Sequence, residues 1–150
     1  MLTKIAPGFM SSTRRNEGDL DELLPRADSV VLALPLTEET RGLLDHRRLG
    51  LLKPGAIFVN IGRGPVVDED ALIDALRSGH LRGAALDVYS TEPLPADSPL
   101  WELDNVILSP HTAAQSIHEN ERIVELFADN LRRYLAGQEL RSRIRTDLFY

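Results

Sequence analysis

The sequence has no cysteine, no long apolar run and no excess of positive charge. Without cysteine, disulfides, thiolate nucleophiles and cysteine-ligated metal sites are excluded. The longest apolar run, Val30–Leu36, contains a proline and is too short to span a bilayer, and residues Met1–Lys4 form no apolar signal core. The net charge of −6 argues against nucleic acid and anionic membranes as general partners. We therefore expect a cytoplasmic protein.

The 150 residues are enough for one domain with a real core, and the hydrophobic share of 43% is ordinary for a globular protein. Short runs of β-favouring residues alternate with helical patterns, which is typical of a parallel sheet built from βα units. Strands are predicted over Phe9–Thr13, Ser29–Leu34, Ile57–Asn60, Gly83–Val88 and Val106–Leu108. Helices are predicted over Leu20–Arg26 with Asp19 as a possible N-cap, over Asp45–Leu52, and from an Asp68 N-cap to Gly79.

A longer helix is predicted near the end of the sequence. Thr112 and Gln115 form a capping-box pair that would open it, and Gly137 would end it. Its apolar positions recur on one face: Val124, Phe127, Leu131 and Leu135.

Three polar residues each follow a predicted strand: Arg63, Glu92 and His111. Arginine can bind a carboxylate through two parallel hydrogen bonds. Histidine can carry a proton near neutral pH, and a neighbouring glutamate can orient the histidine ring. Because open α/β sheets bind ligands at the carboxyl ends of their strands, these residues suggest a reaction centre for a small 2-oxo or 2-hydroxy acid.

Plainer interpretations stay open for each of them. Gly62-Arg63-Gly64 is a poor phosphate-binding fingerprint because Val67 replaces the third glycine; it is either a tight turn needing two glycines or a turn that aims Arg63. Alone, Glu92 would be a surface acid and His111 a polar loop residue. Beside a helix N-terminus the imidazolium of His111 is disfavoured, whereas a carboxylate such as Glu92 favours it.

Other polar residues give weaker signals. Asp87 ends an apolar strand and needs a partner or a ligand. His46, His80 and His118 are interpreted as solvated, and no metal-ligand spacing is present. Trp101 is interpreted as a core or dimer-contact residue, with substrate contact as the alternative.

Taken in order, four segments closely resemble the D-isomer-specific 2-hydroxyacid dehydrogenases, of the glyoxylate/hydroxypyruvate reductase or phosphoglycerate dehydrogenase type. The segments are Asp28–Leu43, Leu52–Asp68, Gly83–Leu94 and Asn105–Ala113. The resemblance implies an α/β fold with a Rossmann-like, doubly wound parallel sheet. It also implies an NAD(P)-dependent oxidoreductase that reduces 2-oxo acids such as glyoxylate or hydroxypyruvate, usually as a homodimer.

The resemblance also implies roles for single residues. Arg63 would bind the substrate's carboxylate and carbonyl, His111 would donate a proton to the carbonyl oxygen, and Glu92 would orient His111. Asp87 would face the nicotinamide amide. The cofactor would be lined, beside these residues, by Leu34, Pro35, Thr40, Ile61 and Ala113.

The sequence departs from the family where the dinucleotide domain normally opens, because it has no Gly-x-Gly-x-x-Gly loop. Met1–Pro7 resembles the tail of the helix that follows this loop, so the first strand, normally in the middle of the sheet, would be missing. Residues 1–137 would then be the C-terminal portion of a dinucleotide-binding domain, and residues 138–150 a tail returning to an absent substrate domain. We expect a chain that is a fragment and is not active alone.

The cofactor and the class of function leave alternatives. Arg14 and Arg15 stand where NAD-preferring relatives carry an acid, which favours the 2′-phosphate of NADP, unless the pair is simply exposed at the start of a loop. The alternative to an enzyme is a non-catalytic NAD(H)-binding module of the corepressor type, or a degenerate gene product.

Overall fold

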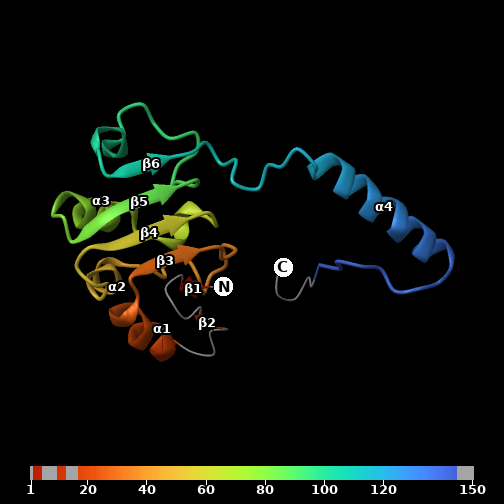
Figure 1. The fold of residues 1–150 in the computed structure, drawn as a ribbon, viewed down its shortest axis with the longest axis horizontal. Helices are drawn as coiled ribbons and strands as arrows, with labels where there is room; N and C mark the ends of the chain where they lie inside the picture. The colour runs from red at the N-terminus through yellow and green to blue at the C-terminus, as the bar shows by residue number, and fades with distance from the viewer. Residues whose placement is uncertain (1, 5–9, 13–16, 145–150) are drawn as a thin grey trace. The chain divides into compact units, whose positions relative to one another are not determined.

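The computed structural model describes residues 2–4, 10–12 and 17–144, and it divides into two compact units, residues 1–113 and 114–150. The first unit is an α/β domain built on one sheet, and the second contains a single helix among its described residues (Figure 1). Within the described residues no helix is long and apolar enough to cross a membrane.

Six strands form the sheet in the order β2-β1-β3-β4-β5-β6. Strands β3 to β6 pair in parallel, which confirms the predicted α/β architecture. The bounds of the strands are Leu2–Lys4 (β1), Met10–Ser12 (β2), Ser29–Leu32 (β3), Ala56–Asn60 (β4), Leu81–Leu86 (β5) and Val106–Leu108 (β6). The five predicted strands are thus confirmed as β2 to β6, with ends that agree to within two residues.

Strand β1 corrects one expectation from the sequence. Leu2–Lys4 do not continue a helix; they pair antiparallel with β2 on one side and β3 on the other, with Leu2 opposite Ser12 and Leu32. The position expected to be vacant in the sheet is therefore occupied. The physical reason is that two neighbouring strands present unpaired backbone groups, which a short extended segment satisfies. The remaining residues of Met1–Pro7 lie outside the described ones.

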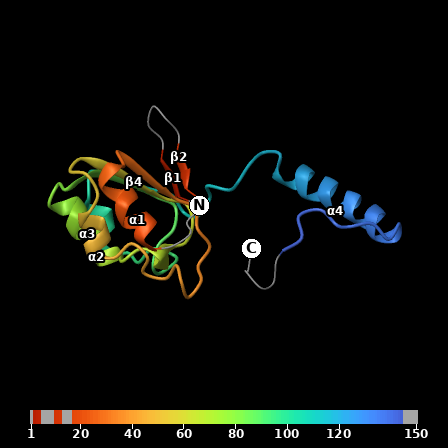
Figure 2. The same ribbon diagram turned by 90° about the horizontal axis from the view of Figure 1, so that it is seen from below.

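The helices of the first unit follow the predicted order. They are α1 (Glu17–Leu23, continued by a 3₁₀ turn to Arg26), α2 (His46–Gly50) and α3 (Glu69–Arg77). Asp68 caps α3 as predicted, accepting the Ala71 N–H at 3.1 Å. Asp19 is not an N-cap, because α1 already begins at Glu17. Helices α2 and α3 lie side by side (Figure 2).

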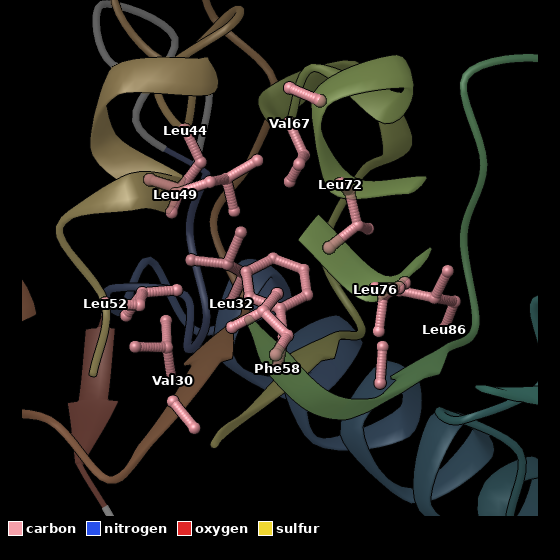
Figure 3. Packing of buried hydrophobic residues seen from close by; sticks show 14 of the residues in the cluster. Val30, Leu32, Leu44, Leu49, Leu52, Phe58, Val67, Leu72, Leu76 and Leu86 are labelled. Carbon is pink, nitrogen blue, oxygen red and sulfur yellow. The ribbon is translucent and has the colours of Figure 1, made fainter. Parts of the chain in front are cut away.

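The core lies between the sheet and these helices. Side chains alternate along β3 and β4, so that Leu32 and Phe58 are buried while Val31 and Val59 are only half-buried. Figure 3 shows Phe58 among leucines from the strands and from α2 and α3. This packing fixes the strands to one another, and it therefore also fixes where the loops at their carboxyl ends begin.

The second unit contains α4, Glu119–Leu135. Its end is as predicted: Gly137 takes a positive φ of 68°, and its N–H bonds to the Tyr134 carbonyl. Its start is not. The Thr112–Gln115 capping box is wrong, because the helix begins seven residues after Thr112, whose N–H is bonded to Asp87 instead.

Two glycines allow the segment after β4 to lie against neighbouring backbone. A Cβ on Gly62 would come within 2.7 Å of the Leu34 carbonyl oxygen, and one on Gly64 would overlap the Tyr89 carbonyl. Neither glycine needs a left-handed backbone; both are required because there is no room for a side chain. Close packing against neighbouring backbone therefore explains both glycines.

We predict that Gly64→Ala destabilises the fold by about 3 kcal/mol, because the clash is with backbone that cannot swing away. The matched control is Gly50→Ala in α2, where an added Cβ meets nothing within 4 Å. Its stability should be unchanged or raised by up to about 1 kcal/mol. Urea unfolding followed by circular dichroism measures both, and equal midpoints for the two variants would contradict the packing argument.

Candidate active site

The structure brings Arg63, Glu92 and His111 to one edge of the sheet. Arg63 follows β4, Glu92 follows β5 and His111 follows β6, which are neighbouring parallel strands. Their carboxyl ends therefore meet at the same edge, where open α/β sheets bind ligands.

His111 and Glu92 form a directly bonded pair. The Nδ1 atom of His111 lies 2.7 Å from Oε2 of Glu92, and the Tyr89 N–H donates to Oε1 of the same carboxylate at 3.0 Å. The bond from His111 is the largest effect holding the pKa of Glu92 below its usual value; the Tyr89 N–H and the charge of Arg63 add to it, against burial. Glu92 is therefore ionised at neutral pH. The His111 side chain is 45% exposed, so its ring is open to a ligand.

Arg63 is held by a network that the sequence did not reveal. The buried side chain of Asn60 accepts the Gly62 N–H at 3.0 Å and donates to the Arg63 carbonyl at 3.1 Å. The Arg63 side chain donates from Nη1 to the Gly62 carbonyl at 2.7 Å. Asn60 thus fixes the turn from which the guanidinium extends. The sequence did contain a sign of this role, because a strand with a buried pattern ends in an amide side chain, which needs hydrogen-bond partners when it is buried.

Asp87, which lies directly after β5, finds its partners in the loop that carries His111. Its carboxylate accepts the Ser109 hydroxyl at 2.6 Å and the N–H groups of Thr112 at 2.8 Å and Ala113 at 2.9 Å. Burial raises the pKa of Asp87, but these three hydrogen bonds, together with the charge of His111, outweigh it and hold the pKa below the usual value. Its contact with a nicotinamide amide stays a prediction.

The environment expected for His111 is partly corrected. No helix N-terminus directly follows it among the described residues, because α4 begins eight residues later at Glu119. Its carboxylate partner is the one predicted, Glu92. Its backbone has a φ of 56°, in the left-handed region.

Tyr89 was missed by the sequence reasoning. Its buried hydroxyl lies 2.8 Å from the Ser109 carbonyl and 3.1 Å from the Leu86 carbonyl, so it joins the ends of β5 and β6. Burial raises the pKa of this phenol, which therefore remains protonated and able to donate.

The residues expected to line a cofactor lie along the same edge where the structure describes them. Leu34 and Pro35 follow β3 and Ile61 follows β4; Ile61 is 45% exposed. The Thr40 hydroxyl donates to the Pro35 carbonyl at 2.8 Å and so fixes the loop after β3. The Ala113 N–H is held by the Asp87 carboxylate. Arg14 and Arg15 lie outside the described residues.

Two interpretations of other residues are corrected. For Trp101 the core role is wrong and the dimer-contact role stays a prediction: the side chain is 56% exposed and its indole N–H donates to the Pro95 carbonyl, while its neighbour Leu100 is buried. His80 is not fully solvated, because its Nε2 atom is buried and makes no hydrogen bond within the described part of the chain. No group of three potential metal ligands occurs among the described residues.

A family model described as "D-isomer specific 2-hydroxyacid dehydrogenase, NAD binding domain" matches residues 9–113. The chain is 48% identical over 120 residues to a glyoxylate reductase of Thermofilum pendens, a match that covers 80% of this chain and 35% of the relative. It is 46% identical over 127 residues to a D-3-phosphoglycerate dehydrogenase of Mycobacterium leprae, covering 85% and 24%. The chain thus spans between a quarter and about a third of the length of these relatives.

Solved structures agree. A D-isomer specific 2-hydroxyacid dehydrogenase from Xanthobacter autotrophicus, in complex with NADPH, superposes with a TM-score of 0.81 at 46% identity, over 89% of this chain and 54% of that one. An NADPH-dependent glyoxylate/hydroxypyruvate reductase from Sinorhizobium meliloti, in complex with NADP, superposes with a TM-score of 0.82 at 33% identity, over 89% and 43%. This chain belongs to the D-isomer specific 2-hydroxyacid dehydrogenase family, and it matches the family's NAD-binding domain.

Proposed function

We propose that this chain supplies the carboxylate-binding and proton-transfer groups for NAD(P)-dependent reduction of a small 2-oxo acid such as glyoxylate or hydroxypyruvate. The observation that carries the proposal is the 2.7 Å His111–Glu92 pair beside Arg63 at the carboxyl edge of the sheet. Relatives that the chain matches are named glyoxylate reductase and glyoxylate/hydroxypyruvate reductase, which supports this substrate class.

The described residues fit the nicotinamide end of the cofactor. Ile61 offers an exposed apolar surface for a flat ring, and the second oxygen of Asp87, which accepts only the Ala113 N–H within the described residues, has capacity left for an amide donor. When bound, the nicotinamide supplies or accepts hydride. The 150 residues contain no Gly-x-Gly-x-x-Gly loop, the motif that binds the cofactor's phosphates in dinucleotide-binding folds.

The residues divide the chemistry among them. Arg63 presents a guanidinium whose fork geometry suits a carboxylate, and so orients the 2-oxo acid. Because Nδ1 of His111 is bonded to Glu92, the proton for the carbonyl oxygen comes from Nε2. Glu92 stays ionised and compensates the imidazolium before the transfer.

The proposal predicts the effect of single substitutions in a chimaera, the Thermofilum pendens glyoxylate reductase with the matching part of its NAD-binding domain replaced by residues 9–113 of this chain. His111→Gln should lower kcat by about 10²- to 10⁴-fold, the contribution typical of a positioned general acid. Arg63→Gln should raise KM for glyoxylate by about 100-fold, because a bidentate charged contact is lost. Glyoxylate-dependent NADPH oxidation measures both.

The matched control is Arg77→Gln, which removes an exposed arginine at the end of α3 and should change neither constant. A folded chimaera that binds NADPH but does not oxidise it in the presence of glyoxylate or hydroxypyruvate would contradict the proposal. That result would favour the non-catalytic NAD(H)-binding module.

We propose NADP as the preferred cofactor, because Arg14 and Arg15 suit a 2′-phosphate. The related structures in complex with NADPH or NADP support this choice. Replacing both arginines with alanine should lower the ratio of kcat/KM for NADPH to that for NADH by about 10- to 100-fold, the worth of one or two charged hydrogen bonds. The same chimaera serves for the measurement, and an unchanged ratio would mean that the pair is merely exposed.

We also propose that the intact protein is a homodimer, as the family resemblance implies. Sedimentation equilibrium should return twice the mass of the polypeptide across micromolar concentrations; a monomer mass would contradict this. A cytoplasmic location stays a prediction.

A further inference from the structure

The backbone at His111 adopts a conformation that residues with a side chain rarely occupy. Its φ of 56° is in the left-handed region, which is unfavourable for a non-glycine residue and persists only where the surroundings impose it. The contacts that impose it lie on both sides of the histidine. Ser109 on one side, and Thr112 and Ala113 on the other, all donate to Asp87.

Asp87 is well suited to hold this loop. It is 4% exposed, and its own N–H is bonded at 2.9 Å to the Asn60 carbonyl at the end of β4, so its backbone belongs to the rigid sheet. Three donors converge on its two oxygens. Only a carboxylate accepts at both positions; an asparagine would turn an NH₂ group toward at least one of these donors.

Glu92 is held separately. Its Oε1 atom accepts the Tyr89 N–H, two residues after Asp87. Two different groups at the end of β5 thus hold the two members of the His111–Glu92 pair. The backbone N–H of Tyr89 holds the Glu92 carboxylate, and the Asp87 side chain holds the residues on either side of His111.

We propose that Asp87 is a positioning residue: its buried carboxylate accepts the Ser109 hydroxyl before His111 and the backbone N–H groups of Thr112 and Ala113 after it, and thereby sets the imidazole against Glu92. The importance of Asp87 for catalysis rests on the proposed function. Its contacts with the loop do not depend on that proposal. This role differs from the contact with a nicotinamide amide, since it operates before any cofactor binds.

The pKa of Glu92 distinguishes this role from a simple effect of charge. Removing the negative charge of Asp87 would, by electrostatics alone, ease ionisation of Glu92 and lower its pKa. Losing the His111 contact would raise that pKa, because this contact is the largest effect that lowers it. The two explanations predict opposite directions.

The experiment is a ¹³C NMR titration of the Glu92 carboxyl in the 150-residue chain. In Asp87→Asn we expect the pKa of Glu92 to rise toward its value in His111→Gln. The matched control, Asp97→Asn, removes an exposed aspartate from the loop that carries Glu92 and should leave the pKa unchanged or slightly lowered.

A folded Asp87→Asn chain in which the pKa of Glu92 is unchanged or lowered would overturn the proposal. If that variant does not fold, Ser109→Ala decides, because it removes one of the three donors and keeps the charge: a smaller rise supports the proposal, and no change overturns it. The titration uses neither cofactor nor substrate. Its outcome is therefore independent of whether the chimaera reduces glyoxylate.

Discussion

Parallel pairing of β4, β5 and β6 is the constraint on which the candidate site depends. Parallel neighbours end at the same edge, so three segments that are far apart in the sequence begin side by side. The pairing is held in place by the buried face of the sheet, where Phe58 and Leu86 pack against α2 and α3. The chemistry at the edge therefore depends on packing well away from it.

A second constraint is the close packing of the segments that follow the strands at this edge of the sheet. At two positions they lie so close to one another that there is no room for a side chain. Gly62 and Gly64 leave room for the backbone of Leu34 and Tyr89, and the buried side chains of Asn60 and Tyr89 bond to the backbone of the segments that follow β4 and β6. Arg63 and Glu92 are thus held by hydrogen bonds to backbone, which suits groups that must keep a fixed geometry.

Local patterns predicted the elements well where the local signal had no competitor. Short runs of β-favouring apolar residues identified β3 and β4, and Asp68 capped α3 as expected. The same logic failed at Thr112, whose capping pattern is sound locally, because Asp87, 25 residues earlier, takes the N–H of Thr112. It failed at Leu2–Lys4 because a position in a sheet depends on the neighbouring strands.

The order of motifs in the sequence determined the α/β class and the family, and it singled out Arg63, Glu92 and His111 as candidate site residues, since strand-forming runs and residue types are local properties. The family resemblance already paired His111 with Glu92, and the structure gave this contact its geometry, with 2.7 Å between Nδ1 and Oε2. Only the tertiary structure decided that Asn60 and Tyr89 bond to the turns around the site and that Asp87 bonds to the loop on both sides of His111. These contacts join residues from different strand ends. Their geometry is set by sheet register and by competition for buried donors, which no single segment encodes.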